Sequence, residues 1–595
     1  MKSLVFTLMV ALLVGFFLLL PQPQQVLAPA RLAMAATPAE LTDNSFMLGP
    51  VKLFDGEKWR DERFVEIKNG RVQQLYLDKP DSTLPWVDGN NQWLIPGLID
   101  SHVHAWGDAL EQALNFGVTT VLDMFGDHQF LAAQKAARAS TAQTNKADIY
   151  GAGTLVTATN GHGTQYGREI PVIAAPAQAS EFVAARLAEG SDFIKIVYTS
   201  DKALRRFRPS IDLATLTAVI TAAKAQGVLA VVHIADLPSA GEAIAAGADG
   251  LVHSFFSEPV SNELLRQMAD GQHFIVPTMT VMEGMLANKI NEELLLKTPP
   301  AALTLAAISS LTERFSHSPI PSDRYALLAN NTKQMAEAGI LLLAGSDAPN
   351  PNTDHGVSLI VEMVLLQRAG VPVLQVLQSA TSAPVEAFGL NEVGYLRPGY
   401  KADMLLLNQD PMADLTTLLA PAAIWKNGWL HQPELPTANS ALNSGLIADF
   451  NTDLNARSGG FAASSDSLMQ GKSAAEISVQ QGVLKVTGTT RPGFAYPWAG
   501  VAWQTGNSIE NGSDFSDISG IRFNIRGTPG QYRLDAFSAG SFMPVSHRFT
   551  VTADWQTIEL PLTVFPGLNA KAVSMLLWNG PQGEFSFELD DITLD

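Results

Sequence analysis

The stretch Trp93-Leu-Ile-Pro-Gly-Leu-Ile-Asp-Ser-His-Val-His104 decides how the chain is organised. Its first seven residues are apolar apart from the Pro-Gly pair, which is typical of a strand buried on both faces. Side chains two apart on a strand point the same way, so His102 and His104 project together from the end of this strand. Two adjacent imidazoles predict a metal site, and the alternative is a pair of polar histidines in a turn.

Downstream of this stretch, apolar strands alternate with helical stretches, the pattern of parallel βα units. Eight such units over residues 93–392 predict a (β/α)8 barrel, whose active site is expected at the carboxyl ends of the strands. Four polar residues lie in or at the ends of later strands: Lys195, His233, His253 and Asp347. The predicted strands are 94–100, 119–124, 148–152, 193–198, 229–233, 250–253, 274–277 and 341–347.

Short strands flank the predicted barrel on both sides. Residues 45–92 and 393–432 each contain an Asn-Gly pair, a strong hairpin signal, and we expect the two pieces to form one composite β-sandwich. Residues 433–445 have the composition of a linker. Residues 446–595 alternate apolar and polar side chains and predict an all-β sandwich or jelly roll. The expected fold class is therefore α/β, with two additional β domains.

Composition narrows the possible functions. The chain has 595 residues and a formal charge of −19, which argues against nucleic-acid binding because phosphates need a basic surface. It has no cysteine, so disulfides, thiolate metal sites and cysteine nucleophiles are excluded. Any metal must therefore be held by His, Asp, Glu or a less common ligand.

The N-terminus predicts export. Lys2 and the apolar run 4–20 resemble a secretory signal, which we assign to residues 1–36. Small residues offer cleavage sites at Ala33-Met34-Ala35 or at Ala28-Pro29-Ala30. We expect an exported, periplasmic protein. The alternative is an uncleaved N-terminal anchor, which would be the protein's one contact with the membrane.

Five motifs in order resemble the amidohydrolase superfamily. They are His102-x-His104, Lys195 in strand four, His233 after strand five, His253 after strand six and Gly345-Ser-Asp347 after strand eight. The segment 380–403 resembles that superfamily's passage from the barrel back to the sandwich. The resemblance covers residues 45–432 and is strongest to the imidazolonepropionase-like and Xaa-Pro-dipeptidase-like hydrolases.

This resemblance implies a metal centre with two divalent ions, expected to be zinc. His102, His104, Asp347 and a carbamate formed from Lys195 and CO2 would hold one ion, and His233, His253 and the same carbamate would hold the other. A water deprotonated by the ions would attack a polarised carbonyl, while Asp347 transfers the proton to the leaving amine. The alternative for Lys195 is an ion pair with an acid across the barrel, because a buried lysine otherwise loses its proton.

The expected function is hydrolysis of an amide or peptide bond in a dipeptide or small cyclic amide. Alternatives are a single-metal deaminase, a lactone or ester hydrolase of the same fold, and a binding protein with an inactive barrel. Deaminases of this fold usually place Glu three residues after the strand-five histidine, where this chain has Asp236. The expected substrate-binding residues are His162, Tyr166, Tyr198 and His355.

The last domain resembles the NADH:ubiquinone oxidoreductase intermediate-associated-protein-30 type, a galactose-binding-like jelly roll. Residues 515–527 and 555–562 carry the resemblance. Its aromatic residues could stack on a glycan, although packing in the core is the favoured interpretation. These residues are Tyr496, Trp498, Trp503 and Trp578.

Overall fold

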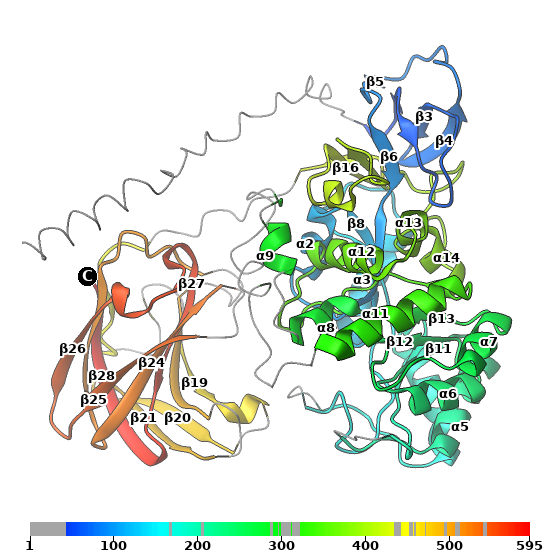
Figure 1. Ribbon diagram of the computed structural model, residues 1–595. Coiled ribbons are helices and arrows are strands. Elements are labelled where there is room, and N and C mark those ends of the chain that lie inside the picture. The colour runs from blue at the N-terminus through cyan, green and yellow to red at the C-terminus, as the bar shows by residue number, and fades with distance from the viewer. Residues whose placement is uncertain are drawn as a thin grey trace, which may run out of the picture.

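The computed structural model separates two bodies of packed structure (Figure 1). Their apolar cores share no residue, because the core of the last domain begins at Leu442 and the other cores end at Trp425. None of the helices in the described part of the chain is long and apolar enough to cross a membrane. The described residues are 43–165, 169–203, 208–285, 290–295, 297–298, 311, 322–432, 442–451, 456, 460–469, 472–492, 497–505, 512–539 and 544–595.

The first body contains a ring of parallel strands. β7 to β9 form one sheet and β10 to β14 form another, each with its strands in chain order. Isolated parallel bridges join the two sheets at both edges, between Val156 and Ile196 and between Val103 and Ala348. The strands are β7 (Leu98–Val103), β8 (Val118–Asp123), β9 (Asp148–Gly151), β10 (Ile194–Val197), β11 (Ala230–His233), β12 (Gly250–Val252), β13 (Phe274–Val276) and β14 (Leu341–Leu342).

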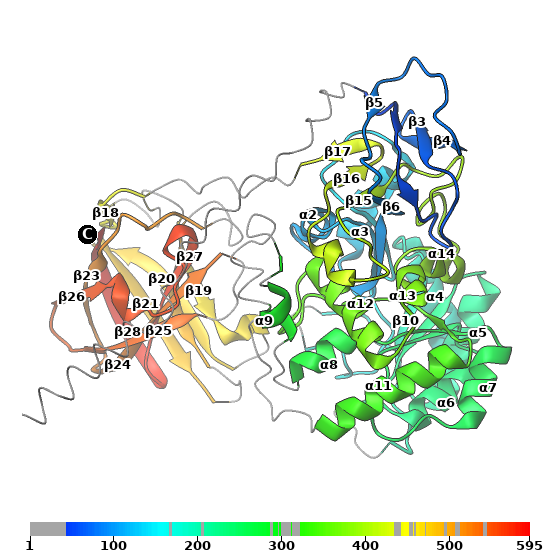
Figure 2. The same ribbon diagram turned by 45° about the horizontal axis from the view of Figure 1, so that its top comes forward.

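Helices follow these strands, as the sequence pattern predicts, and bury apolar faces against them (Figure 2). α5, for example, buries Leu216, Val219 and Ile220. The helices are α2 (Ala109–Asn115), α3 (His128–Lys135), α4 (Ala179–Ala188), α5 (Leu213–Ala225), α6 (Leu237–Ala245), α7 (Asn262–Asp270), α8 (Met279–Met285), α9 (Ile290–Leu295), α11 (Ser322–Glu337), α12 (Val357–Ala369), α13 (Val373–Ser379) and α14 (Ser382–Phe388).

Two predicted strand boundaries are wrong. The expected strand 94–100 is divided at Pro96-Gly97 into β6 (Trp93–Pro96) and β7. A side chain at Gly97 would meet the Oγ1 of Thr119 at 2.2 Å, so the chain passes too close to β8 for any other residue. The last strand, expected over 341–347, ends at Leu342, and Asp347 lies beyond it in a left-handed conformation with φ of 56°.

The segments on either side of the ring share a sheet. One sheet has the order β4-β3-β1-β5, and a second has the order β17-β16-β15-β6-β2 and so combines strands from both flanking segments (Figure 2). Phe46, Leu94, Met404 and Trp425 belong to the core between them. The strands are β1 (Phe46–Leu48), β2 (Lys52–Leu53), β3 (Phe64–Lys68), β4 (Arg71–Tyr76), β5 (Trp86–Val87), β15 (Met404–Leu407), β16 (Ala423–Lys426) and β17 (Trp429–His431).

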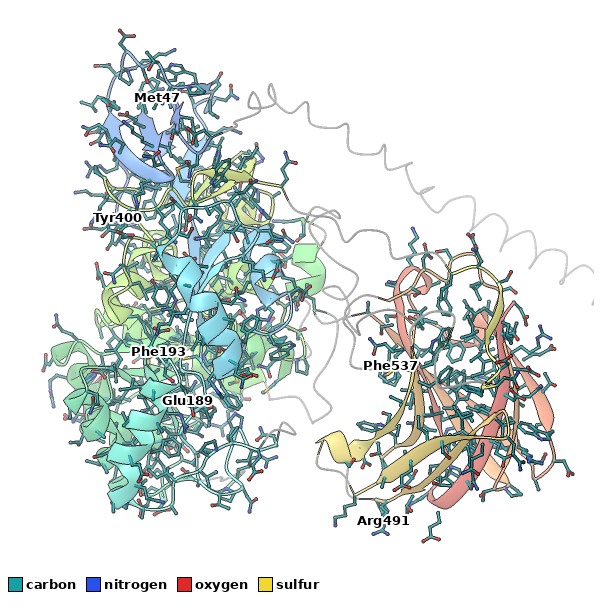
Figure 3. All side chains as sticks on the ribbon, turned by 180° about the vertical axis from the view of Figure 1, so that it is seen from behind. Met47, Glu189, Phe193, Tyr400, Arg491 and Phe537 are labelled. Atoms are coloured by element: carbon teal, nitrogen blue, oxygen red, sulfur yellow. The ribbon has the colours of Figure 1, made fainter. Side chains whose placement is uncertain are left out.

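The last domain consists of two antiparallel sheets, with orders β20-β21-β28-β23-β26 and β19-β22-β27-β24-β25. β18 adds to the first sheet by pairing with β28. Side chains from both sheets, of which Figure 3 gives an overview, pack into one core. The strands are β18 (Gly445–Ala448), β19 (Gly460–Ser465), β20 (Ala474–Gln480), β21 (Val483–Thr490), β22 (Ala499–Gln504), β23 (Gly520–Gly527), β24 (Gly530–Ser538), β25 (Val545–Val551), β26 (Gln556–Pro561), β27 (Val573–Asn579) and β28 (Gly583–Leu594).

The aromatic residues considered for glycan stacking divide into three groups. Trp503 and Trp578 have 0% exposure and belong to the core, which agrees with the favoured interpretation. The indole of Trp498 is half-buried and donates a hydrogen bond to the Ser464 hydroxyl at 3.1 Å. Tyr496 lies outside the described residues.

Truncation should test the independence of the two bodies. Because their cores share no residue, we expect a chain ending at Ser440 to retain its metal content and most of its turnover on a small substrate. The measurement is metal content and rate, compared with the full chain. Loss of metal from the truncated chain would show that the last domain is part of the catalytic fold.

Candidate active site

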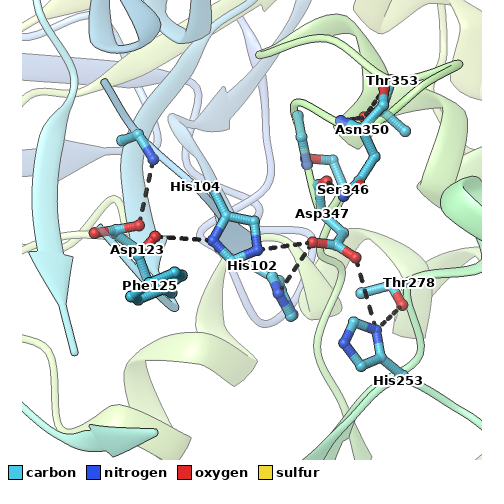
Figure 4. A network of polar contacts seen from close by, with 12 residues as sticks. His102, His104, Asp123, Phe125, His253, Thr278, Ser346, Asp347, Asn350 and Thr353 are labelled. Atoms are coloured by element: carbon cyan, nitrogen blue, oxygen red, sulfur yellow. Dashed lines mark hydrogen bonds and ion pairs between the residues drawn. The ribbon is translucent and has the colours of Figure 1, made fainter. Parts of the chain in front are cut away.

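Two histidines and an aspartate meet at the carboxyl end of the strand ring (Figure 4). His102 lies in β7, His104 follows two residues later, and Asp347 lies in the turn after β14. The Asp347 Oδ1 atom is 3.2 Å from His102 Nε2 and 3.1 Å from His104 Nε2. One ligand atom from each of the three residues falls within 4.8 Å of the others. The predicted first cluster is therefore brought together where the first and last strands of the ring, β7 and β14, come side by side.

A buried acid, Asp100, joins β7 to the turn after β14. Asp100 Oδ1 accepts hydrogen bonds from the backbone N–H of His102 at 3.2 Å and of Ser346 at 3.0 Å. The N–H of Asp347 in turn donates to the carbonyl of His102 at 2.7 Å. Gly345 permits this approach, since a side chain there would meet the Cβ of His102 at 2.8 Å. Asp100 therefore fixes the relative position of His102, His104 and Asp347.

Three further histidines continue the cluster. The ring centroid of His253 lies 4.9 Å from that of His102 and 4.5 Å from that of His233, and His162 stacks on His233 at 5.1 Å. His253 Nδ1 is 2.7 Å from the Thr278 hydroxyl and 3.8 Å from Asp347 Oδ2 (Figure 4). The structure therefore places His233 and His253, the ligands expected for a second ion, beside the first group.

Lys195 occupies the interior of the ring in β10 with 3% exposure. Burial lowers the pKa of its amine to about 7, although the charges of Asp347 and Asp123 act in the opposite direction. Within the described residues, none of the carboxylates forms an ion pair with it at 4.0 Å or less. A substantial fraction of this amine is therefore unprotonated near neutral pH, the state that reacts with CO2.

Most of the other groups have the protonation states that a metal centre requires, and His104 is the exception: burial alone would lower its pKa, but the hydrogen bond and charge of Asp347 raise it. Burial lowers the pKa of His102 to about 3 and those of His233 and His253 well below the usual value. Burial alone would raise the pKa of Asp347, but its close contacts with the imidazoles of His102 and His104 hold it well below its usual range. Metals bind neutral imidazoles and ionised carboxylates, so His102, His233, His253 and Asp347 are already in the binding state, while His104 would release its proton on binding.

The donor set fits a divalent ion. Both ring nitrogens of His102 are buried, and neither has hydrogen-bond geometry with another described residue, although Nε2 lies close to Asp347. A buried imidazole without hydrogen bonds is costly unless another ligand satisfies it. Nitrogen and carboxylate oxygen together suit zinc among several divalent metals.

The four expected substrate-binding residues have different surroundings. His162 stacks on His233 and so lies beside the cluster. His355 lies after the turn that contains Asp347, and its side chain is buried, with 4% exposure. Burial lowers the pKa of its imidazole to about 3. The Tyr198 hydroxyl donates to Glu242 Oε2 at 2.5 Å, so it is engaged with α6. Tyr166 lies outside the described residues, and the roles of all four remain predictions.

A pH-dependent stability follows from Asp354, beside His355. Burial raises the pKa of its carboxyl group to about 7. The folded state therefore holds this proton more tightly than the unfolded state, and the resulting stability is present at low pH and lost as the pH rises through about 7. Asp354→Asn should thus be more stable relative to wild type at pH 8 than at pH 5. Denaturant unfolding of the metal-free proteins measures this, and an equal difference at both pH values would contradict it.

Comparison with known proteins agrees with this geometry. The model of the amidohydrolase family matches residues 93–433. Ochratoxinase of Aspergillus niger is 23% identical over 392 residues, which cover 57% of this chain and 75% of that protein. A solved Xaa-Pro dipeptidase with bound methionine aligns with a TM-score of 0.53 at 20% identity, over 65% of this chain and 100% of that chain. Molinate hydrolase aligns with a TM-score of 0.51 at 19% identity, over 65% and 95%. At these identities the structural likeness shows the fold alone.

Proposed function

The chain belongs to the amidohydrolase family and is a hydrolase acting on carbon–nitrogen bonds, and from this premise we propose that it cleaves an amide or peptide bond of a small substrate with the help of divalent metal. The observation that carries the proposal is the contact of His102, His104 and Asp347 beside the buried amine of Lys195. The relatives are named for ochratoxin, Xaa-Pro dipeptides and molinate, which supports a dipeptide or another small molecule as the substrate.

Six residues would hold two zinc ions. His102, His104 and Asp347 would bind one ion, His233 and His253 the other, and a carbamate on Lys195 would contact both. The carbamate forms when the unprotonated Nζ adds to the carbon of CO2 and releases one proton, which leaves a negatively charged group with two oxygens. Bound there, divalent ions supply Lewis acidity that polarises a carbonyl and lowers the pKa of water.

Asp347 is the proposed proton carrier. Its carboxylate is ionised and held between His102 and His104, so it can accept a proton from the attacking water. The same carboxyl group then gives that proton to the nitrogen of the breaking bond, which leaves as an amine. His162 and His355 lie near enough to the cluster to orient the substrate.

Three finer assignments belong to the same proposal. The strand ring is the predicted (β/α)8 barrel, and the last domain is a jelly roll of the galactose-binding-like type. The signal-like segment at residues 1–36 directs the protein to the periplasm. Determining the N-terminus of the protein from its native host tests the last of these, since a cleaved protein begins between Arg31 and Thr37.

A single-metal deaminase is the second candidate, favoured by a short match. The deaminase of Carboxydothermus hydrogenoformans that acts on 5-methylthioadenosine and S-adenosylhomocysteine is 31% identical over 102 residues, covering 15% of this chain and 24% of that protein. Against it, Asp236, at the position of the deaminase glutamate, accepts a hydrogen bond from the Ser239 N–H at 2.8 Å and so caps α6.

Metal analysis and a substrate screen test the proposal. The zinc-loaded protein should contain about two ions per chain and hydrolyse members of a dipeptide, N-acyl amino acid or lactone library. One ion with release of ammonia would favour the deaminase. A protein that binds no ion would instead be a binding protein with an inactive barrel.

A further inference from the structure

Glu362 is a buried acidic residue, with a pKa raised by burial to about 7, to which neither the sequence pattern nor the proposed mechanism gives a role. It lies in α12 with 0% exposure, within a run of ten consecutive buried residues from Val357 to Leu366. A carboxylate in such a place is costly unless specific donors satisfy it. A leucine at the same position would pack the helix without that cost, so the partners of Glu362 indicate what the carboxylate does.

The donors that satisfy Glu362 come from the start of α8, from Thr280 and the backbone of Met279. Its Oε2 atom accepts from the backbone N–H of Thr280 at 2.8 Å and from the Thr280 hydroxyl at 2.7 Å. Its Oε1 atom has no hydrogen-bond partner among the described residues. Both bonds therefore restrain a single point, the start of α8 just after β13.

The start of α8 follows an unusual turn. Thr278, two residues before Thr280, has φ of 50°, a left-handed conformation that a β-branched residue adopts only under strain. Its hydroxyl lies 2.7 Å from His253 Nδ1, and both side chains are buried (Figure 4). His253 itself has φ of 67°, so both ends of this contact depend on backbone conformations that the surrounding structure must enforce.

We propose that Glu362 is a positioning residue of the hydrolytic site, which holds the turn from Thr278 to Thr280 so that Thr278 fixes the ring of His253. This inference rests on the proposed function. Histidines that ligate metals commonly bond their second nitrogen to a neighbouring group, which sets the orientation of the ring. Here Thr278 engages Nδ1, and Nε2 is left for the ion. Glu362 acts on the metal site only through this turn and contacts neither substrate nor ion.

Four variants and one control test the inference. Glu362→Leu removes the acceptor, Glu362→Gln keeps one acceptor oxygen, Thr280→Val removes one of the two donors, and Thr278→Val removes the group on His253. Thr332→Val is the matched control, because Thr332 is also fully buried but, among the residues that the structure describes, its hydroxyl bonds only the carbonyl of Leu328 within its own helix. Cobalt affinity is measured on each protein by competition with a chelator, and crystal structures of the metal-free wild type and variants report the Nδ1–Oγ1 distance.

Thr278→Val and Glu362→Leu should each weaken cobalt binding by about 10- to 100-fold, with Glu362→Gln between Glu362→Leu and wild type. The double variant Glu362→Leu/Thr278→Val should bind no worse than Thr278→Val, since both changes act through one contact. In the metal-free structure of Glu362→Leu, Thr278 should have left His253. Thr332→Val should match wild type.

The inference is overturned if Glu362→Leu keeps the Thr278–His253 contact, or if its effect adds fully to that of Thr278→Val. If Glu362→Leu does not fold, Thr280→Val decides by the same two measurements. A wild type that binds no cobalt would contradict the proposed function instead, and the metal-free distance in the variants would still decide the role of Glu362.

Discussion

Replacing Lys195 with alanine should empty the metal site and abolish hydrolysis. The change removes the proposed anion shared by both ions and leaves a cavity at the proposed metal site. The loss of activity should exceed the roughly 100-fold that follows when a group in the outer shell of a metal site is removed. Metal content and turnover of the purified, folded variant measure the effect.

Chemical rescue distinguishes this explanation from simple unfolding. Acetate or propionate fits the space left by the lysine and supplies carboxylate oxygens, so adding either with zinc should restore part of the activity. Asp347→Ala is the control, because it removes the proton carrier as well as a ligand and should not be rescued to the same degree. A Lys195→Ala protein with normal metal content and turnover would show that the bridging carbamate is wrong and would favour the single-metal alternative.

Replacing Asp148 with alanine should destabilise the catalytic body strongly. Asp148, at the start of β9, accepts from the amines of Lys401 and Lys426 at 2.8 Å each, and Lys426 also contacts Asp403 at 2.7 Å. All four side chains are at least 95% buried. The variant leaves Lys401 buried beside no described carboxylate, and removing one member of a buried pair costs on the order of 3–5 kcal/mol.

Denaturant unfolding of the metal-free protein measures this cost. The control is Glu293→Ala, since Glu293 pairs with Arg368 but both side chains are about half exposed. Solvent screens such pairs, so the control should lose no more than about 1 kcal/mol. Equal losses in the two variants would contradict the prediction. Burial alone would raise the pKa of Asp148, but the charges of Lys426 and Lys401 hold it below its usual value.

Much of the strand ring could be predicted from the sequence, because buried parallel strands are continuous apolar runs and their polar ends stand out. His102, Lys195, His253 and Asp347 were recognisable for that reason: each interrupts or ends such a run. The predicted ends of the strands were less accurate than their existence. The division at Pro96-Gly97 depends on the approach of Thr119, and the early end of β14 depends on the turn that carries Asp347.

The supporting residues could not be predicted, because their roles exist only after folding. Asp100 accepts a hydrogen bond from the N–H of Ser346, which lies far away in the sequence. Glu362 in α12 accepts one from Thr280 in α8. In the sequence, Asp100 is one acid at the end of an apolar run, and Glu362 is one polar residue in a helix. Tyr198 is the opposite case, a residue that the sequence suggested for the substrate pocket because it follows Lys195. In the structure its hydroxyl donates a hydrogen bond to Glu242.

The shared sheet has a consequence for the order in which the chain can fold during synthesis. β6 pairs with β15 in a register that joins Pro96 to Met404, so the strand leading directly into His102 has no neighbour on that side until the end of the catalytic region has left the ribosome. Contacts this distant in sequence form slowly, because a long loop must close first. β7, which carries His102, is thus among the first segments of the catalytic region to be made. The sheet around β6, which leads into β7, is among the last to be completed. The site-bearing part of the chain therefore stays incomplete until translation has passed Met404.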